Sequence, residues 1–306
     1  MSTIGIDIGG SKALAVRLED GVIVAERFTA SRTGSLHETT VAAIREVLDP
    51  AVTAIGVGAA GLVRWPEGVF AWGPHLDGTD IPLREMLEEE FELPVVVDSD
   101  ANAAAYGEHV AGAARGFDDF LLVTLGTGIG GAIVVGGSIY RGESFAGEWG
   151  HMRHDPAGRR CDCGKRGCWE TVASGPALVR LAREVIALNP EGSLAVRLND
   201  TFTGEDVTAA ADAGDEVARG LVAEVGAELG RGLANLIAIF DPELVVVGGG
   251  LGSLGESLLG PARRFAAEAL HGGNHRLLPP ILVAGGGPRA GAIGAAYLAA
   301  SIRSRP

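Results

Sequence analysis

Residues Thr3–Leu18, TIGIDIGGSKALAVRL, consist of an apolar run, a Gly-Gly-Ser turn and a second apolar run. Apolar runs of this length on either side of a glycine turn are typical of a β-hairpin. Asp20-Gly21 and the run Val22–Phe28 extend the hairpin to a three-stranded antiparallel meander. Asp7 ends the first strand directly before the glycines. The meander therefore also presents a carboxylate at a turn suited to binding an anion or a metal ion.

The same pattern returns later in the chain. After the meander, helical spacing is found at 36–48 and 83–91, and apolar strands are predicted at 53–58 and 94–97. A helix near 102–114 is followed by a strand at 120–125, a Gly-Thr-Gly turn, and strands at 130–135 and 138–140. This repetition predicts an α/β fold with a duplicated βββαβα core.

The remaining elements divide the chain into two expected domains. A helix is predicted at 217–240, a buried strand at 244–247, a strand at 279–284 and a last helix at 291–301. We expect a smaller N-terminal α/β domain of residues 1–114 plus about 290–306. Residues 115–289 are expected to form a larger α/β domain. The last helix, at 291–301, is assigned to the first domain because no other predicted element remains to cover the elements of that domain.

Composition excludes several classes of partner. Of 306 residues, 25 are basic and 39 are acidic, which gives a net charge of −14. That charge repels a nucleic-acid backbone and an anionic membrane surface, so neither is expected as a partner. Met1 leads directly into the first strand, with neither a basic segment nor a long apolar run. This pattern favours a cytoplasmic location.

Two glycine turns are candidates for phosphate binding. Asp7–Lys12 reads DIGGSK, and Leu125–Gly131 reads LGTGIGG. Because glycine has no side chain, the backbone N–H groups of such a turn can converge on an anion. Neither turn has the spacing of a Walker loop, and a strand follows each turn where a Rossmann motif has a helix. Either turn alone is equally well interpreted as a plain hairpin; their occurrence in a duplicated frame favours phosphate.

A third glycine cluster follows the strand at 244–247, at the end of a strand where open α/β sheets bind ligands. It is a candidate for the nucleoside, or else a tight connection. The candidate ATP-binding residues are thus Asp7, Gly9, Gly10, Ser11, Lys12, Thr127, Gly128, Gly248, Gly249 and Gly250.

All three cysteines lie close together and near a histidine. His151, Cys161, Cys163 and Cys168 have the spacing His-x9-Cys-x-Cys-x4-Cys, with Gly164 and Gly167 in the last loop. Three thiolates and one imidazole satisfy a closed tetrahedral zinc site. We therefore predict a structural zinc ion. The alternative is a redox-active or incidental cysteine cluster.

Three carboxylates near these motifs are candidates for chemistry. Asp100 follows a buried strand at the start of a helix; taken alone it is favoured as the helix N-cap, and the alternative is a base directed into a cleft. Glu148 and Glu170 lie on either side of the zinc motif. Both are either solvated surface acids or a pair that binds sugar hydroxyls.

The sequence resembles the ROK family of sugar kinases, in particular the actinobacterial-type ATP glucokinases. The matching segments span nearly the whole chain: Gly5–Lys12 (GIDIGGSK), Gly58–Gly61 (GAAG), Asp100–Ala105 (DANAAA), Leu125–Gly131 (LGTGIGG), Gly147–His151 (GEWGH) and Cys161–Glu170 (CDCGKRGCWE).

The resemblance implies an actin-like, ribonuclease-H-like fold of two domains that binds a hexose and MgATP. It implies transfer of a phosphoryl group to the sugar 6-hydroxyl, with Asp100 as the base. The implied sugar-binding residues are Gly61, His75, Ser99, Asp100, Glu148, His151 and Glu170, with structural zinc supporting the last three. It also implies a homodimer or homotetramer, and some relatives accept polyphosphate as well as ATP.

This chain departs from the family pattern at two sugar-binding positions. Ser99 and His75 stand where the family usually has asparagine. Loss of a polar partner changes which substrate a pocket accepts. A modified hexose, such as kanosamine or an N-acetylhexosamine, is therefore an alternative to glucose. A non-catalytic sugar-sensing protein is a further alternative, but the net charge opposes DNA binding and the phosphate turns and Asp100 are intact.

Overall fold

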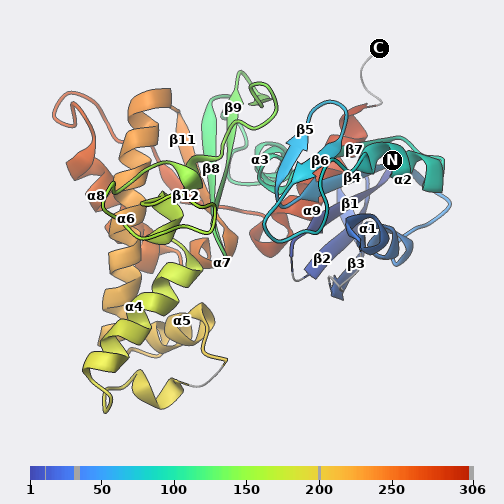
Figure 1. The fold of residues 1–306 in the computed structure, drawn as a ribbon. Coiled ribbons are helices and arrows are strands. Elements are labelled where there is room, and N and C mark those ends of the chain that lie inside the picture. Colours follow the sequence, from blue (N-terminus) through green and yellow to red (C-terminus); the bar gives the residue numbers. More distant parts are fainter. Residues whose placement is uncertain (11, 31–34, 199–200, 303–306) are drawn as a thin grey trace. The chain divides into compact units, whose positions relative to one another are not determined.

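The computed structural model describes residues 1–10, 12–30, 35–198 and 201–302, and it has two five-stranded sheets (Figure 1). Its strands are β1 (Ser2–Ile8), β2 (Lys12–Glu19), β3 (Val22–Ala30), β4 (Val52–Ala59), β5 (Leu62–Arg64), β6 (Val69–Trp72), β7 (Val95–Ser99), β8 (Phe120–Leu125), β9 (Ile129–Val135), β10 (Ser138–Tyr140), β11 (Leu244–Gly248) and β12 (Ile281–Val283). Its helices are α1 (Leu36–Arg45), α2 (Leu83–Phe91), α3 (Asp100–Ala111), α4 (Gly175–Leu188), α5 (Gly204–Asp212), α6 (Glu216–Phe240), α7 (Gly249–Gly252), α8 (Glu256–Ala269) and α9 (Ala290–Ile302).

The two sheets have the same strand order. The first is β3-β2-β1-β4-β7 and the second is β10-β9-β8-β11-β12. In each sheet, sequential strands form the meander, and strands from later in the chain are added on the other side of its first strand. The predicted duplication and the actin-like, ribonuclease-H-like fold are thus confirmed.

The chain divides into two compact units. Unit 1 comprises residues 1–122, 132–147 and 284–306, and unit 2 comprises residues 123–131 and 148–283. The domain boundary near residue 114 that the sequence suggested stays a prediction.

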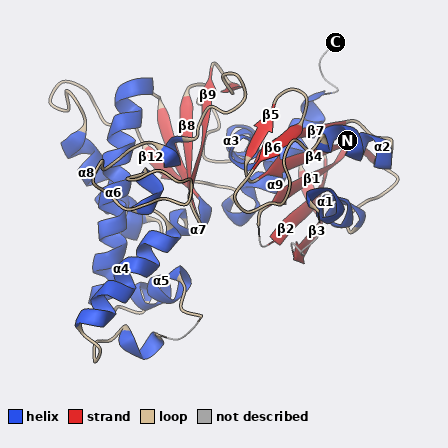
Figure 2. Ribbon diagram, in the orientation of Figure 1, coloured by secondary structure: helices blue, strands red, loops and turns tan. Residues whose placement is uncertain are grey.

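The first sheet is covered by helices on both faces (Figure 2). Along β2, Ala13 and Ala15 pack into the core that α1 covers, whereas Leu14 and Val16 pack against α9. This alternation is the period of two expected for a strand buried on both faces. Gly5 of β1 and Gly56 of β4 lie against α9: a Cβ atom on Gly5 would come within 1.9 Å of the Ala292 carbonyl oxygen, and one on Gly56 within 1.9 Å of that of Ala295. Glycine therefore allows the helix to lie directly on the sheet.

Unit 2 contains a long helical layer (Figure 1). The helix α6, drawn in orange, packs on α8 at Gly226 and Gly230. A Cβ atom at these positions would lie 2.5 Å from the Leu258 carbonyl oxygen and 2.2 Å from that of Ala262, so the two backbones are in close contact. Among the described residues, no helix is both long and apolar enough to cross a membrane.

Candidate active site

The candidate residues of unit 1 lie where three parallel strands end together. Ile8 of β1 is paired with Ala59 of β4, and Ala59 with Ser99 of β7. In an open α/β sheet, this edge is where ligands bind. Asp7 and the segment leading to Asp100 therefore reach the same edge from different parts of the chain.

Asp100 is the first residue of α3, and Ser99 is the N-cap of this helix. The Ser99 hydroxyl accepts the N–H of Asn102 at 3.2 Å, whereas the Asp100 carboxylate accepts the N–H of Ala101 at 2.8 Å. The interpretation of Asp100 as the N-cap was wrong, as was the helix start near residue 102. Serine is a preferred N-cap, and an acidic residue in the first turn is favoured by the helix dipole. Ser99, and not Asp100, therefore caps α3 and shapes the turn.

Asp7 carries a perturbed carboxyl group close to Asp100. Burial and the negative charge of Asp100 raise the pKa of Asp7 to about 7, against the opposing effect of Lys12. The Asp7 side chain, from β1, lies against the start of α9: a Cβ atom on Gly291 would come within 2.6 Å of the Asp7 carboxylate. Sequence reasoning missed Gly291, because its partner is almost the whole chain away. A buried carboxylate that is costly to ionise is well suited to a cation.

The first glycine turn is a closed hairpin. The Gly9 N–H donates to the Lys12 carbonyl at 3.0 Å, so this amide is used within the turn. Gly10 lies against His75, whose Cβ atom would be 2.5 Å from a Cβ added to Gly10. Gly61 is in the left-handed region at φ +152°, and a Cβ there would lie 2.6 Å from the Trp72 carbonyl oxygen. Ser11 lies outside the described residues.

Unit 2 contains the cysteine cluster. The ligand atoms of His151, Cys161, Cys163 and Cys168 all lie within 4.8 Å of one another. Cys163 Sγ and Cys168 Sγ are 3.6 Å apart, and Cys161 Sγ is 3.7 Å from His151 Nδ1. Tetrahedral zinc with Zn–S bonds of about 2.3 Å separates two sulfurs by roughly 3.8 Å. The donor set and its spacing therefore fit a zinc ion.

The thiols of this cluster perturb one another. Burial, and then the Glu170 hydrogen bond, raise the pKa of Cys161; burial and the Cys163 hydrogen bond raise that of Cys168. Burial also acts to raise the pKa of Cys163, but the N–H of Lys165 and the two neighbouring thiols outweigh it and lower this pKa. The thiolate of Cys163 is thus stabilised, whereas those of Cys161 and Cys168 are disfavoured. A bound cation would stabilise all three thiolates.

Glu170 connects the cluster to the second glycine turn. Its Oε1 is 2.9 Å from Cys161 Sγ and 3.3 Å from His151 Nδ1. Its Oε2 would lie 2.6 Å from a Cβ atom added to Gly128. Burial raises the pKa of Glu148, and the negative charge of Glu170 adds to this against the effect of His151. The carboxylates, the cluster and Gly128 of unit 2 therefore lie close together.

Two tryptophans fix the segments that carry these side chains. Trp169 is fully buried, and a Cβ atom on Gly232 of α6 would come within 2.0 Å of its ring. Trp149 packs on Gly131 in the same way, at 1.9 Å. Each ring occupies the space that the missing side chain leaves.

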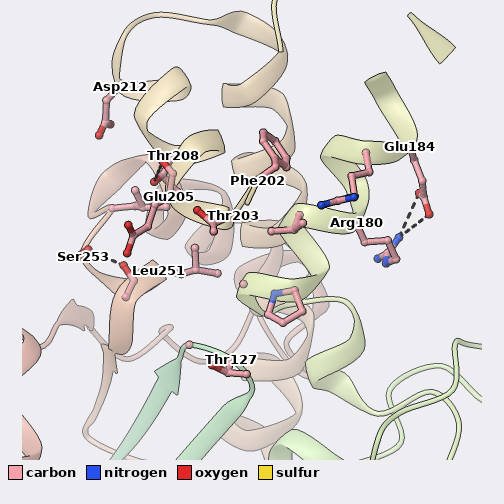
Figure 3. A pocket seen from close by; sticks show the side chains of 18 of the residues that line it. Thr127, Arg180, Glu184, Phe202, Thr203, Glu205, Thr208, Asp212, Leu251 and Ser253 are labelled. Carbon is pink, nitrogen blue, oxygen red and sulfur yellow. Dashed lines mark hydrogen bonds and ion pairs between the residues drawn. The ribbon is translucent and has the colours of Figure 1, made fainter. Parts of the chain in front are cut away.

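A cavity of about 1300 Å³ lies beside the second glycine turn (Figure 3). It is lined by Thr127 and Gly250, and by α4 and α5 residues such as Arg180 and Glu205. Gly249, directly after β11, is at φ +79° and packs on β8, where a Cβ would lie 2.3 Å from the Leu125 carbonyl oxygen. The α4 and α5 residues were missed, because the sequence analysis predicted neither helix.

The two sheets of the same strand order place the chain in the class of actin-like, ribonuclease-H-like proteins. The candidate polar groups, Asp7 with Asp100 in unit 1 and the cysteine cluster with Glu170 in unit 2, accompany these sheets. The family model described as "ROK family" matches residues 3–302, so the chain belongs to the ROK family.

Several known proteins are similar over nearly the whole chain. The glucokinase of Streptomyces coelicolor is 40% identical, with 97% of each chain covered. The N-acetylmannosamine kinase of Citrobacter koseri is 35% identical over 88% of this chain and 89% of its own. The crystal structure of a ROK family glucokinase from Streptomyces griseus, in complex with glucose and AMPPNP, has a TM-score of 0.91. It is 39% identical, with 98% of this chain and 100% of that chain covered.

Proposed function

We propose that this protein is an ATP-dependent hexose kinase that phosphorylates the sugar 6-hydroxyl, with glucose as the first candidate substrate. The observation that carries the proposal is the position of Asp100, which starts α3 at the edge where β1, β4 and β7 end, with Asp7 close to it. The similarity to the Streptomyces griseus glucokinase with glucose and AMPPNP supports the same substrates.

In the proposed reaction, the Asp100 carboxylate accepts a hydrogen bond from the 6-hydroxyl and orients its oxygen toward the γ-phosphorus of ATP. The bond between the sugar oxygen and phosphorus forms as the bond to the β,γ-bridging oxygen breaks, and ADP leaves. The hydroxyl proton passes to Asp100. Because phosphoryl transfer has a loose transition state, an ordinary carboxylate suffices as the base.

The other residues are proposed to hold the two substrates. Glu148, His151 and Glu170 bind sugar hydroxyls, together with Gly61, His75 and Ser99. The two glycine turns bind the phosphates, and the cavity beside Thr127 and Gly250 takes the nucleoside, because it is large, partly apolar and contains polar side chains.

Two metal ions are proposed from the donor sets. The Cys/His cluster would hold a structural zinc ion, which fixes the segments carrying Glu148 and Glu170. Asp7 would hold the magnesium of MgATP, which when bound neutralises charge on the transferring phosphoryl group. A homodimer or homotetramer and a cytoplasmic location are also proposed, on the similarity to the family.

The test of the activity is a coupled ADP-release assay with Asp100→Asn. We expect kcat to fall by about 100- to 10,000-fold, while sugar binding measured by calorimetry is retained. The control is Asp20→Asn, at a turn residue with φ +47° that asparagine tolerates well. An unchanged rate in Asp100→Asn would contradict the proposal.

The identity of the sugar requires a panel. The same assay with glucose, mannose, fructose, glucosamine, N-acetylated hexosamines and kanosamine ranks the substrates by kcat/KM. Because the Ser99 hydroxyl is used to cap α3, it replaces an amide only in part, which favours testing sugars modified on the ring. A modified hexose that exceeds glucose in kcat/KM would reassign the substrate and leave the kinase activity in place.

A further inference from the structure

A buried ion pair lies directly behind the turn that carries Asp100. Asp98 is only 2% exposed, and its Oδ2 accepts two hydrogen bonds from the Arg141 guanidinium, from Nε at 2.9 Å and from Nη2 at 2.6 Å. Its Oδ1 accepts the N–H of Ser99 and the side-chain amide of Asn102, both at 2.8 Å. Ser99 and Asn102 lie on either side of Asp100 in the chain. One carboxylate therefore fixes both ends of the turn.

Arg141 is itself held from several directions. Its guanidinium carbon is 3.9 Å from the centroid of the Trp65 ring, and its Nη1 donates to the Ile139 carbonyl at 3.3 Å. The backbone N–H of Trp65 donates to the Ser144 hydroxyl at 3.1 Å. A planar guanidinium matches both the two-pronged bond to a carboxylate and the stack on an aromatic face. A lysine would provide the charge without this geometry.

We propose that Asp98 and Arg141 are positioning residues for phosphoryl transfer, which fix the direction of the Asp100 carboxylate. This inference rests on the proposed function, in which Asp100 is the base. A displacement of about 1 Å at a reacting group is enough to cost roughly 100-fold in rate. The pair bonds to the residues around Asp100 and not to the base itself, and it acts through the Ser99 backbone N–H and the Asn102 side chain.

A purely structural role makes a different prediction. If the pair only stabilised the fold, its loss would lower the fraction of folded protein and leave kcat per folded molecule unchanged. If it positions Asp100, kcat per folded molecule falls while substrate affinity, which depends on many other contacts, changes little.

The experiment compares Asp98→Asn and Arg141→Lys with the wild type and a matched control, in the ADP-release assay with glucose and MgATP. The control Asp49→Asn breaks another arginine–carboxylate pair of unit 1, Arg17 with Asp49 at 2.7 Å, at an exposed position. Rates are normalised to the folded fraction measured by circular dichroism. We expect kcat to fall by about 10- to 100-fold in both variants, with KM for each substrate within about threefold of the wild type. Asp49→Asn should match the wild type.

A rescue experiment separates geometry from folding. Arg141→Ala should lose kcat and regain at least about fivefold of it with millimolar guanidinium, whereas equal ammonium should not restore it, because only guanidinium has the planar fork. Variants with normalised kcat within twofold of Asp49→Asn, or without guanidinium rescue, would overturn the positioning role. A wild type that phosphorylates no sugar would instead overturn the proposed kinase activity.

Discussion

Gly232 is a position where a single added methyl group should disturb the core of unit 2. A Cβ atom there would lie 2.0 Å from Cε2 of the fully buried Trp169. Because carbon atoms in contact are about 3.5 Å apart or more, the ring must retreat by roughly 1.5 Å. The Trp169 Nε1–H donates to the Glu228 carbonyl at 3.0 Å, and such a retreat breaks this bond. The substitution Gly232→Ala therefore both overpacks the core and leaves a buried donor without its acceptor.

The magnitude follows from three contributions. Overpacking costs about 1–3 kcal/mol, and the lost hydrogen bond about 1–3 kcal/mol more. Replacing glycine by alanine in a helix returns about 1 kcal/mol. We expect Gly232→Ala to lower the free energy of unfolding by about 3 kcal/mol. In the same helix, Gly220 is exposed and has no atom within 4 Å of its Cβ position, so Gly220→Ala should raise it by about 1 kcal/mol.

Urea denaturation of both variants, followed by circular dichroism, measures this difference. Trp169 lies between Cys168 and Glu170, so we also expect Gly232→Ala to release zinc to a colorimetric chelator faster than the wild type does. If Gly232→Ala were as stable as Gly220→Ala, the packing argument would be refuted.

Two further predictions concern the metal site and pH. Cys161→Ala should lose zinc, stability and sugar affinity together, because the cluster fixes Glu170; a variant that kept zinc and full affinity by calorimetry would contradict this. The hydrogen bond from His154 lowers the pKa of Glu228 below its ordinary value of 4.5. Glu228 therefore contributes stability above about pH 4.5 that is lost as pH falls through its lowered pKa. In urea titrations, the stability difference between wild type and Glu228→Gln should be full at pH 6 and shrink below pH 4; a difference independent of pH would be inconsistent with this pair.

Features encoded in short stretches of sequence were predicted well. The opening meander and the turn of Leu125–Gly131 were identified by local alternation and glycine, and the Cys161–Cys168 loop by spacing alone. The structure gathers these cysteines with His151 as that spacing requires. Such patterns work because the turn or ligand geometry is decided within a few residues.

Contacts between distant segments could not be predicted in this way. Arg141 and Asp98 are 43 positions apart, and neither side chain carries a local sign of its partner. The cap of α3 is different, because Ser99 precedes Asp100 and is the better N-cap by its chemistry; this signal was present and was assigned to the wrong residue.

The position of Glu170 has a consequence for how the two substrates influence each other. One of its oxygens faces Cys161 and the other faces Gly128 of the second glycine turn. On the proposed function, the same side chain therefore binds the sugar and packs against the turn that binds the phosphates of ATP, so that a change at either substrate is felt at the other. Linkage then requires reciprocity: whatever factor glucose introduces into the dissociation constant of the nucleotide, the nucleotide must introduce into that of glucose.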